Sequence, residues 1–488
     1  MAEKLEFPHL NERVIKGIRG FNLCSFLVAY EGWRRGLNLR WYHEESVECK
    51  LSRLNSSILG NFFSLDDGKN KHYFYRSRGD KVSNSAVLLV QDKSKTKELL
   101  KEKGVSIPLG EKFDINSNEK IIDYAESIGY PVVIKPINGS MGRGVFVNIQ
   151  NRQQLSDIIK HYHENLKHKD VLLEKYYKGK EYRFYVVGNK VVSAINRIPA
   201  NIIGDGENTI EELIRLKNIE REKNPYLASK PIKVDYEIEQ LLKKQLVDLH
   251  YVPNRNEQIF LRELSNLSAG GDPIDCTNEI SDEIKQLAVD GLKALPAIPH
   301  AGVDIIINPD DPTKGVILEV NATAEISFHS FPLAGNLNDV PAAIIDYYFP
   351  DSVQNEKSRF FFDYRSLLGP LKSLSANFIE TYPAPMGELV GVRFDVVGKL
   401  NKVGYMKWIR RQALIEGHHG YVKKLSSDKM SVFVYGTDLE KLKQFYKKCK
   451  KGSKKSRVEN VEMKVLNVNK HKHIKVGFRM YPGKKTKM

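Results

Sequence analysis

Two apolar runs in the second half of the chain contain polar side chains where a buried strand usually has none. AGVDIIIN carries Asp304, and GVILEVNAT carries Glu319 and Asn321, with the turn sequence NPDDPTK between them. Side chains two residues apart on a strand share a face, so positions 319 and 321 lie together and Asp304 on the neighbouring strand can join them. Two carboxylates and an amide oxygen are hard ligands suited to Mg²⁺, whereas an unpartnered buried carboxylate is costly. The pattern predicts a metal-binding hairpin; the alternative is a pair of strands at an exposed sheet edge.

A glycine-rich loop follows the strand sequence VVIKP. The strand delivers Lys135, and the loop contains Gly139, Gly142 and Gly144. A lysine supplies positive charge for phosphate, and glycines let backbone N–H groups approach phosphate oxygens closely. Taken alone, an ordinary glycine-rich turn is the favoured interpretation. The P-loop pattern, in which Gly-Lys and a Ser or Thr follow a glycine after four residues, occurs nowhere and disfavours a P-loop nucleoside triphosphatase.

The segment VLLEKYYKGKEYRFYVV places two glutamates beside a glycine. Glu174 ends an apolar run, and Glu181 follows beyond Gly179. A carboxylate can accept hydrogen bonds from ribose hydroxyls, and backbone groups near Lys175–Tyr177 can pair with the edge of adenine. Two ordinary glutamates flanking a strand are the favoured interpretation when this segment is taken alone.

The length of 488 residues is too great for one hydrophobic core and predicts roughly two to four domains. We expect a small α/β unit at 1–82, a mixed α/β domain at 83–351, a linker packed on the surface at 352–388, and a basic domain at 389–488. The linker is expected because its aromatic and proline residues show little periodicity.

The first unit is expected to contain a helix over Phe21–Arg35, a strand over Leu37–His43 and a hairpin in FFSLDDGKNKHYFYRS that turns at Asp66-Asp67-Gly68. In the mixed domain, the pattern predicts three helices and two strands: helices at 121–127, 211–217 and 284–295, and strands at 302–307 and 315–320.

The last hundred residues are strongly basic. From Leu389 to the end, 26 Lys and Arg stand against 7 Asp and Glu, a local net charge of +19, and the rest of the chain sums to −3. Alternation predicts strand 390–400, helix 403–415, a hairpin at 421–435, helix 439–449 and strands 458–468 and 473–480. This β-α-β-β-α-β order is the ferredoxin-like split motif.

Taken together and in this order, the nucleotide and metal segments resemble the ATP-grasp superfamily over about 83–350. The most similar members are the ATP-grasp parts of cyanophycin synthetase and of the bifunctional glutathione synthetase; D-alanine–D-alanine ligase is more distant. The matching stretches are QDKSKTKELL, IGYPVVIKP, GRGV, EKYYKGKEYRFYVV, RIPANIIGDGENTIEEL, LRELSNLSAGGDPIDCT, AGVDIII, EVN and HSFPLAG. The chain lacks the further regions of these relatives, and ATAEISFH after Asn321 lacks their usual proline.

The resemblance implies a role for each matching residue. Lys93 and Lys135 correspond to phosphate-contacting lysines, and Asp304, Glu319 and Asn321 to metal ligands. Groups near the γ-phosphate and the acyl phosphate are implied at Arg262 and Asn266. The remaining nucleotide-binding positions implied are Gly142, Arg143, Gly144, Glu174, Lys175, Tyr177 and Glu181, with Arg183 and Arg197 as further candidates for phosphate or substrate carboxylate.

The implied activity is ATP-dependent carboxylate–amine ligation through an acyl phosphate, with ADP and phosphate released. ATP and Mg²⁺, with Mn²⁺ as an alternative metal, are the implied cofactors, and an amino acid or peptide supplies the carboxylate and the amine. Two alternatives stay open. One is a glutathione-synthetase-like ligase that adds glycine to a γ-glutamyl dipeptide, and the other is a nucleotide-responsive protein that binds a polyanion or nucleic acid.

The basic tail resembles acylphosphatase over about 390–480. The arginine and asparagine that acylphosphatases need correspond here to Met406 and Lys424, so hydrolysis is not expected and a scaffold or binding module is. The net charge of +19 favours polyanions such as an acidic polymer, nucleic acid or a membrane surface. A solvated lysine face is an equally weighted alternative.

Cysteine usage and hydropathy bear on the cellular compartment. The four cysteines lie far apart, which fits neither a disulfide framework nor a zinc site. The apolar stretch FNLCSFLVAY is too short to span a bilayer, and no secretory signal pattern opens the chain. We therefore expect a cytoplasmic protein without a membrane span, and a homo-oligomer.

Overall fold

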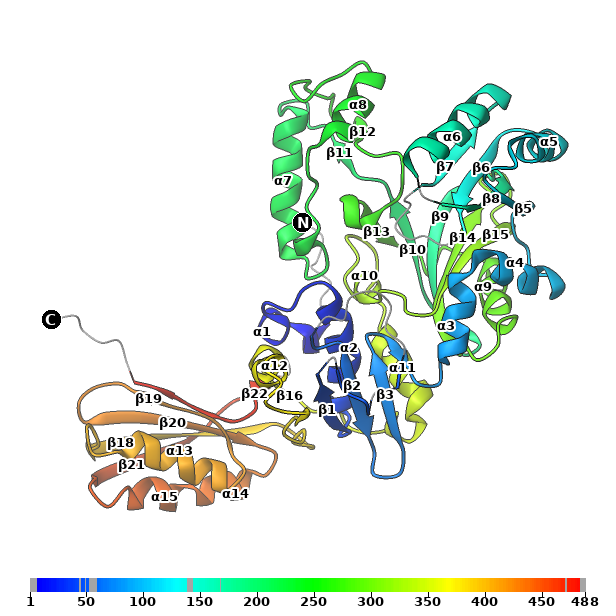
Figure 1. Cartoon of the computed structure of the whole chain (residues 1–488). Coiled ribbons are helices and arrows are strands. Elements are labelled where there is room, and N and C mark those ends of the chain that lie inside the picture. The colour runs from blue at the N-terminus through cyan, green and yellow to red at the C-terminus, as the bar shows by residue number, and fades with distance from the viewer. Residues whose placement is uncertain are drawn as a thin grey trace.

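The computed structural model describes residues 7–43, 45–48, 50–51, 59–137, 144–166, 168–469 and 472–482. Within these residues, three bodies are visible in Figure 1: an N-terminal unit, a central α/β region and a C-terminal sheet with helices on one face. Among the described helices, none combines the length and the apolar character needed to cross a membrane.

The N-terminal unit packs one buried helix against a sheet. Helix α2 (Phe21–Arg34) is buried along nearly its whole length and shares a core with β1 (Asn38–Tyr42), β2 (Phe62–Asp66) and β3 (Lys71–Tyr75). The short β4 (Arg78–Gly79) extends the same sheet. The predicted helix, strand and hairpin are confirmed. Asp67 shapes the hairpin turn, because its Oδ1 accepts from the backbone N–H groups of Lys69 and Asn70 at 2.8 and 2.6 Å.

The segment 352–388 is not a surface linker, and this expectation is corrected. It forms β16 (Phe360–Phe361), α12 (Tyr364–Lys372) and β17 (Phe378–Glu380), and β17 completes the N-terminal sheet by pairing with β1. Phe360, Phe361 and Phe362 are buried in the same core as α2. The periodicity is weak because these aromatics fill a core built by residues more than 300 positions earlier.

A four-stranded sheet forms one half of the central region, in the order β5-β8-β6-β7. Helices α5 (Asn118–Ile128) and α6 (Arg152–Asn165) pack on it through a shared apolar core. The predicted helix at 121–127 is therefore confirmed. The strands of this sheet are β5 (Gly110–Asp114), β6 (Val132–Pro136), β7 (Phe146–Ile149) and β8 (Asp170–Lys175).

A five-stranded antiparallel sheet forms the other half, in the order β13-β10-β9-β14-β15. Helix α9 (Asp282–Lys293) packs on it, and its apolar residues share a core with those of α3 (Asn84–Gln91) and α4 (Lys93–Glu102). The predicted helix at 284–295 and both predicted strands are confirmed. The strands are β9 (Lys180–Val187), β10 (Lys190–Ile198), β13 (Asp272–Asp275), β14 (His300–Ile307) and β15 (Gly315–Asn321).

A subdomain is inserted between β10 and β13. It contains α7 (Ile210–Lys223), α8 (Tyr236–Lys244) and the two-stranded sheet of β11 (Asn201–Ile203) and β12 (Gln258–Phe260), with a core of its own. After β15 the chain forms the short α10 (Ser327–Ser330) and then α11 (Val340–Tyr348), which packs on α2. These last contacts join the central region to the N-terminal unit.

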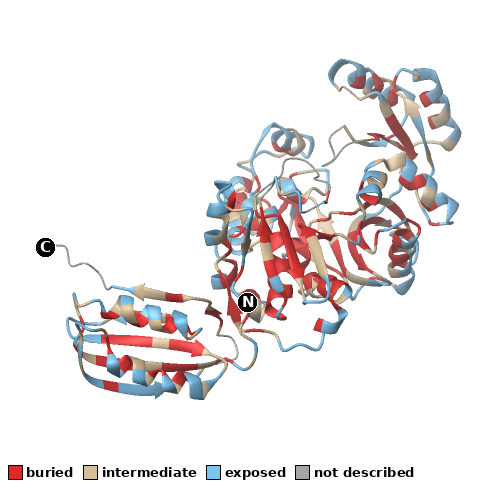
Figure 2. Cartoon of the chain, turned by 60° about the horizontal axis from the view of Figure 1, so that its bottom comes forward, coloured by how far each residue is buried: buried red, intermediate tan, exposed pale blue. Residues whose placement is uncertain are grey.

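The C-terminal domain has the predicted β-α-β-β-α-β order, and the strand predicted at 473–480 forms as two short strands, β22 and β23. Its sheet runs β21-β18-β20-β19-β23, and β23 pairs in parallel with β19. Its apolar side chains pack under helices on one face. The outer residues of the helices and of the edge strand β21 are largely exposed, whereas Asp395, Ser431 and Tyr435 on the other face of the sheet are buried (Figure 2). The elements are β18 (Val390–Lys399), α13 (Tyr405–Ile415), β19 (His419–Lys424), β20 (Lys429–Gly436), α14 (Leu439–Gln444), α15 (Tyr446–Lys451), β21 (Arg457–Val465), β22 (Ile474–Lys475) and β23 (Phe478–Tyr481).

Candidate functional site

The predicted metal-binding hairpin forms at β14 and β15. Asp304 lies directly opposite Glu319 in the register, and Asn321 lies opposite Gly302. The amide Nδ2 of Asn321 donates to Oε1 of Glu319 at 2.9 Å, which confirms that positions 319 and 321 share a face. Asp304 is buried, whereas the side chain of Glu319 is 36% exposed. The hairpin therefore presents one deep and one accessible carboxylate on neighbouring strands.

Two arginines surround the deep carboxylate. Arg183 on β9 donates from Nε and Nη2 to the two oxygens of Asp304, the Nη2–Oδ2 distance being 2.8 Å. Nη2 of Arg197 on β10 lies 3.1 Å from Oδ2 of Asp304 and also pairs with Glu181. Burial alone would raise the pKa of Asp304, but the two arginines hold it well below its usual range. Asp304 is therefore ionised at neutral pH.

At Glu181 the pKa is raised, whereas at Asp304 it is lowered. The pKa of Glu181 is raised because burial outweighs the attraction of Arg197, and because Asp304 and Glu319 add negative charge nearby. Its second oxygen, Oε2, accepts from Ser265 Oγ at 3.2 Å. The carboxylate predicted to meet a ribose is thus part of the charged cluster.

Glu174, on strand β8 of the four-stranded sheet, lies between Lys135 of β6 and Lys97 of helix α4. Nζ of Lys135 is 2.7 Å from Oε2, and Lys97 pairs with Oε1, all three groups being buried. Burial lowers the pKa of Lys135 to about 8, and burial together with the charge of Lys135 lowers the pKa of Lys97. One carboxylate thus faces two ammonium groups, which leaves positive charge for a further anion. The expected adenine or ribose contact of Glu174 stays a prediction.

Lys97 was not predicted as a site residue. Helix α4 begins at the N-cap Asp92, whose side chain accepts from the N–H groups of Ser94 and Lys95. Lys93 and Lys97 are four residues apart on this helix and therefore share a face. That spacing, once a helix is expected in QDKSKTKELL, is the signal that could have found Lys97.

The two charged groups lie close enough to form one site. Lys135 on β6 feels the charges of Glu319 and Glu181 from the five-stranded sheet and of Lys93 at the start of α4. Lysines from helix α4 and strand β6 therefore lie near a carboxylate cluster on the five-stranded sheet. We call this set the charged strip: Lys93, Lys97, Lys135, Glu174, Glu181, Arg183, Arg197, Asp304, Glu319 and Asn321. The structure brings these residues together from segments more than 200 positions apart.

Other predicted residues lie around the strip. Lys175 donates from Nζ to the carbonyl oxygens of Gly129 and Tyr130 at 2.8 and 3.1 Å, and Tyr177 is exposed. Gly144 has φ 70°, a conformation that favours glycine. Gly142, Arg143 and Gly139 lie outside the described residues, so their roles stay predictions.

Arg262 pairs with carboxylates of the inserted subdomain and not with those of the charged strip among the described residues. Its guanidinium pairs with Asp235 at 2.5 Å and with Glu237, both at the start of α8. Asn266 accepts from Ser268 N–H at 2.9 Å and so shapes its own loop. That loop reaches the strip through Ser265, which the sequence did not single out. The expected roles of Arg262 and Asn266 near phosphate stay predictions.

His329 is a third residue that sequence reasoning missed. It is buried on α10, and its Nδ1 lies 2.8 Å from Ser193 Oγ. Burial and the charges of Arg183 and Arg197 lower its pKa, so the ring is neutral. Its Nε2 has no hydrogen-bond partner among the described residues. The signal was its place in HSFPLAG, shortly after the strand that carries Asn321.

The strip fits a nucleoside triphosphate with a divalent cation. Carboxylate and amide oxygens on one hairpin form a suitable donor set for Mg²⁺. The crowded ammonium groups of Lys97 and Lys135 are suited to phosphate oxygens. Nε of Arg197 is buried and has no hydrogen-bond partner among the described residues. Both signs of charge that such a ligand requires are therefore present.

Comparisons with known proteins identify two domains in the chain. The RimK-like ATP-grasp domain matches residues 90–206, and the acylphosphatase family matches residues 392–480. The bifunctional glutathione biosynthesis protein of Clostridium perfringens is 32% identical over 375 residues, covering 71% of this chain and 48% of that protein. The cyanophycin synthetase of Crocosphaera subtropica is 35% identical over 272 residues, covering 54% of this chain and 31% of that protein.

A crystal structure of the bifunctional glutathione synthetase of Pasteurella multocida aligns with 30% identity and a TM-score of 0.47, covering 60% of this chain and 41% of that chain. In each of these three comparisons, the chain spans less than half of the relative's length.

Proposed function

Since this chain carries a RimK-like ATP-grasp domain and a C-terminal acylphosphatase-like domain, we propose that it is an ATP-dependent carboxylate–amine ligase that forms an amide bond. The observation that supports this most is the charged strip, in which Lys93, Lys97 and Lys135 face the hairpin of Asp304, Glu319 and Asn321. A reaction between a triphosphate and a carboxylate brings several negative groups together, and both halves of the strip serve to neutralise them.

Each half of the strip has its own task. The lysines would hold the phosphate oxygens, while Asp304, Glu319 and Asn321 would hold the metal ion. When bound, Mg²⁺ supplies charge neutralisation between phosphate oxygens. Arg183 holds Asp304 ionised and oriented through two hydrogen bonds, which supports its proposed role as a preorganised carboxylate of the site.

The proposed chemistry has two balanced steps. The substrate carboxylate attacks the γ-phosphorus of ATP, the bond to the β-γ bridging oxygen breaks, and ADP leaves. An amine then attacks the acyl carbon of the acyl phosphate, phosphate leaves, and the amine loses a proton. Neither step requires a side-chain nucleophile, so the work of this chain is to position the reactants and neutralise charge.

A product screen tests the proposal. The protein is incubated with Mg²⁺–ATP and pools of amino acids and short peptides, ADP release is followed, and new amides are identified by mass spectrometry. The expected result is ADP formation that depends on one pool, with a product lighter by one water than its two substrates together. ATP binding without ADP or a new amide in any pool would contradict the proposal.

A second candidate has a specific observation in its favour. The glutathione biosynthesis protein of Clostridium perfringens matches 71% of this chain, which is more than the ATP-grasp region alone. The same screen therefore includes one defined substrate pair, a γ-glutamyl dipeptide and glycine. Turnover with that pair alone favours the glutathione-synthetase-like reaction, whereas turnover with other pairs excludes it as the sole activity.

A further inference from the structure

A basic groove lies where the N-terminal unit meets the C-terminal domain. It has a volume of about 1220 Å³ and is lined by residues from 13–18, 361–366, 420–435 and 472–481. None of its lining residues belongs to the ATP-grasp region. The groove therefore requires an explanation that is independent of the charged strip.

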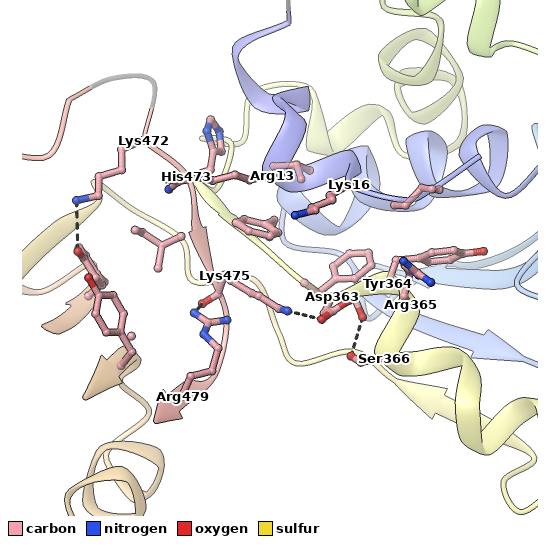
Figure 3. A pocket seen from close by; sticks show the side chains of 18 of the residues that line it. Arg13, Lys16, Asp363, Tyr364, Arg365, Ser366, Lys472, His473, Lys475 and Arg479 are labelled. Atoms are coloured by element: carbon pink, nitrogen blue, oxygen red, sulfur yellow. Dashed lines mark hydrogen bonds and ion pairs between the residues drawn. The ribbon is translucent and has the colours of Figure 1, made fainter. Parts of the chain in front are cut away.

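The charge of the groove is almost entirely positive. Seven of its lining residues are Lys or Arg and one, Asp363, is acidic. Arg13 and Lys16 come from α1 (Glu12–Ile15) and the residue after it, while Lys475 and Arg479 come from the last two strands (Figure 3). Asp363 is already engaged, because it pairs with Lys475. Arg479 also feels the charge of Asp363, but among the described residues only Lys475 of these seven cations forms an ion pair with a carboxylate, so the groove is electrostatically suited to a polyanion.

The cations are crowded rather than dispersed. Burial lowers the pKa of Lys472, and the charge of Arg13 on the opposite wall lowers it further. Nζ of Lys472 donates to Tyr435 Oη at 3.3 Å, and Nη2 of Arg479 donates to the carbonyl oxygen of Lys475 at 3.1 Å. These hydrogen bonds orient the side chains of Lys472 and Arg479 but do not neutralise their charges. An anionic ligand would relieve the mutual repulsion of the two walls.

Aromatic rings distinguish the groove from a plain lysine surface. Tyr421, Tyr435 and Tyr481 line it from the face of the sheet that the helices leave uncovered. The rings of Tyr421 and Phe433 stack with centroids 4.6 Å apart, and Tyr481 meets Tyr421 edge-on at 5.4 Å. Tyr481 is 47% exposed, so its ring is accessible to a ligand. Aromatic rings on an open sheet beside cations are the arrangement with which proteins stack nucleobases and hold the backbone.

We propose that this groove binds single-stranded nucleic acid, with phosphates on the cations of both walls and a base stacked on the exposed ring of Tyr481, beside the half-buried Tyr421. An acidic peptide or polyphosphate would use the cations but gain nothing from Tyr481. A membrane surface fits less well, because the cations line a concave groove. This inference does not depend on ligase activity, since the groove and the strip share no residue.

Fluorescence anisotropy with the full chain tests the proposal. Labelled 12-nucleotide oligo-U and oligo-dT are the probes, and their comparison distinguishes RNA from DNA as the source of the ligand. Arg13→Glu combined with Lys423→Glu reverses one exposed charge on each wall and is expected to weaken binding about tenfold or more. Tyr481→Ala removes the accessible ring without changing charge and should weaken binding roughly fivefold or more.

A matched control reverses two charges elsewhere in the same domain. Lys447→Glu with Lys450→Glu alters exposed residues of α15, which packs on the helical side of the sheet. This variant should retain oligonucleotide binding within about twofold, which separates the groove from the general basicity of the domain. Melting curves establish that each variant is folded.

Four results would overturn the proposal. The first is no oligonucleotide binding at low salt, and the second is an equal loss of affinity in the groove variants and the α15 variant. The third is tighter binding of poly-glutamate than of oligonucleotide. The fourth is displacement of the probe by unlabelled polyphosphate while Tyr481→Ala binds the probe normally. The last two would assign the groove to an acidic peptide or to polyphosphate instead. ADP release by the groove variants is measured in parallel, so a failed ligase assay remains distinguishable from failed nucleic-acid binding.

Discussion

The charged strip and the basic groove both concentrate ionised side chains, but they treat charge differently. In the strip, Asp304, Glu174 and Glu181 each pair with one or two cations, and most of these groups are buried. In the groove, one carboxylate meets seven Lys and Arg residues, of which four are exposed and three are half-buried. Pairing fixes side chains in a definite geometry, which chemistry requires, whereas unbalanced charge serves to attract a ligand. The difference indicates that the two regions do different work.

Asp304→Asn in the strip should lower the free energy of unfolding far more than a charge change in the groove does. It leaves the buried Arg183 without its carboxylate, and breaking such a pair costs about 3–5 kcal/mol. Because the pKa of Asp304 is lowered on folding, its stabilisation is fully present above a pH of about 4 and is lost as the pH falls. Urea unfolding at pH 7 measures the loss. The groove variant Lys423→Glu is the comparison, with an expected change below about 0.5 kcal/mol; equal losses would remove the distinction.

Glu319→Gln with Asn321→Ala should nearly abolish turnover while preserving the fold. These side chains are the more accessible part of the proposed metal site, so the expected loss of kcat is about 100-fold or more. ADP release at saturating Mg²⁺ and ATP is the measurement, with the substrates found in the product screen. Glu283→Gln on α9, an exposed glutamate, is the matched control. Near-normal ADP formation in the double variant would count against the metal assignment.

Nucleotide binding should become coupled to proton uptake at alkaline pH. Burial lowers the pKa of Lys135 to about 8, so the free protein loses this proton above that pH. Bound phosphates favour the charged form and raise the pKa again, so binding takes up a proton and weakens by up to about tenfold per pH unit above pH 8. Calorimetry at pH 9 in buffers of different ionisation enthalpy measures the uptake. Lys135→Arg should abolish it, and unchanged uptake would contradict the role of Lys135.

Met406→Ala should have the smallest effect. Met406 occupies the position of the arginine that acylphosphatases need, and its side chain packs against the apolar core of the C-terminal domain. Ligation is therefore expected to stay within about twofold of the original rate. The rate of ADP release checks this, and a collapse would mean that the C-terminal domain takes part in catalysis.

Local patterns were sufficient to predict much of the fold and part of the site. The ATP-grasp and acylphosphatase-like assignments are confirmed by the family matches. The shared face of Glu319 and Asn321 follows from strand alternation alone, and the structure shows it. The basic character of the C-terminal domain was visible in the composition, but the groove was not. Its walls come from residues 13–18, 361–366 and 472–481, which no local pattern connects.

The prediction of a linker at 352–388 was wrong for the same reason, namely that contacts between distant segments leave no local pattern. The segment 352–388 has little periodicity of its own because its structure is set by distant partners. Nε1 of Trp33 donates to the carbonyl oxygen of Tyr382 at 2.7 Å, and Arg40 pairs with Glu380 across β1 and β17. Ser265 was missed for a related reason, since only the packing of several elements brings it to Glu181, whereas local signals existed for Lys97 and His329. Partners that are hundreds of residues apart cannot be recognised from a window of sequence.

The pairing of β17 with β1 also constrains how the polypeptide can be made. The chain leaves the N-terminal unit after Val82 and returns to it near Phe360, so the ATP-grasp region is an insertion tethered at both ends. On the ribosome, the N-terminal sheet must wait for its last strand until Glu380 has emerged. The inserted region, although synthesised later than α2, can complete its own cores first. Synthesis and assembly therefore run in different orders, and a fragment ending at residue 351 would lack part of the core with which the chain begins.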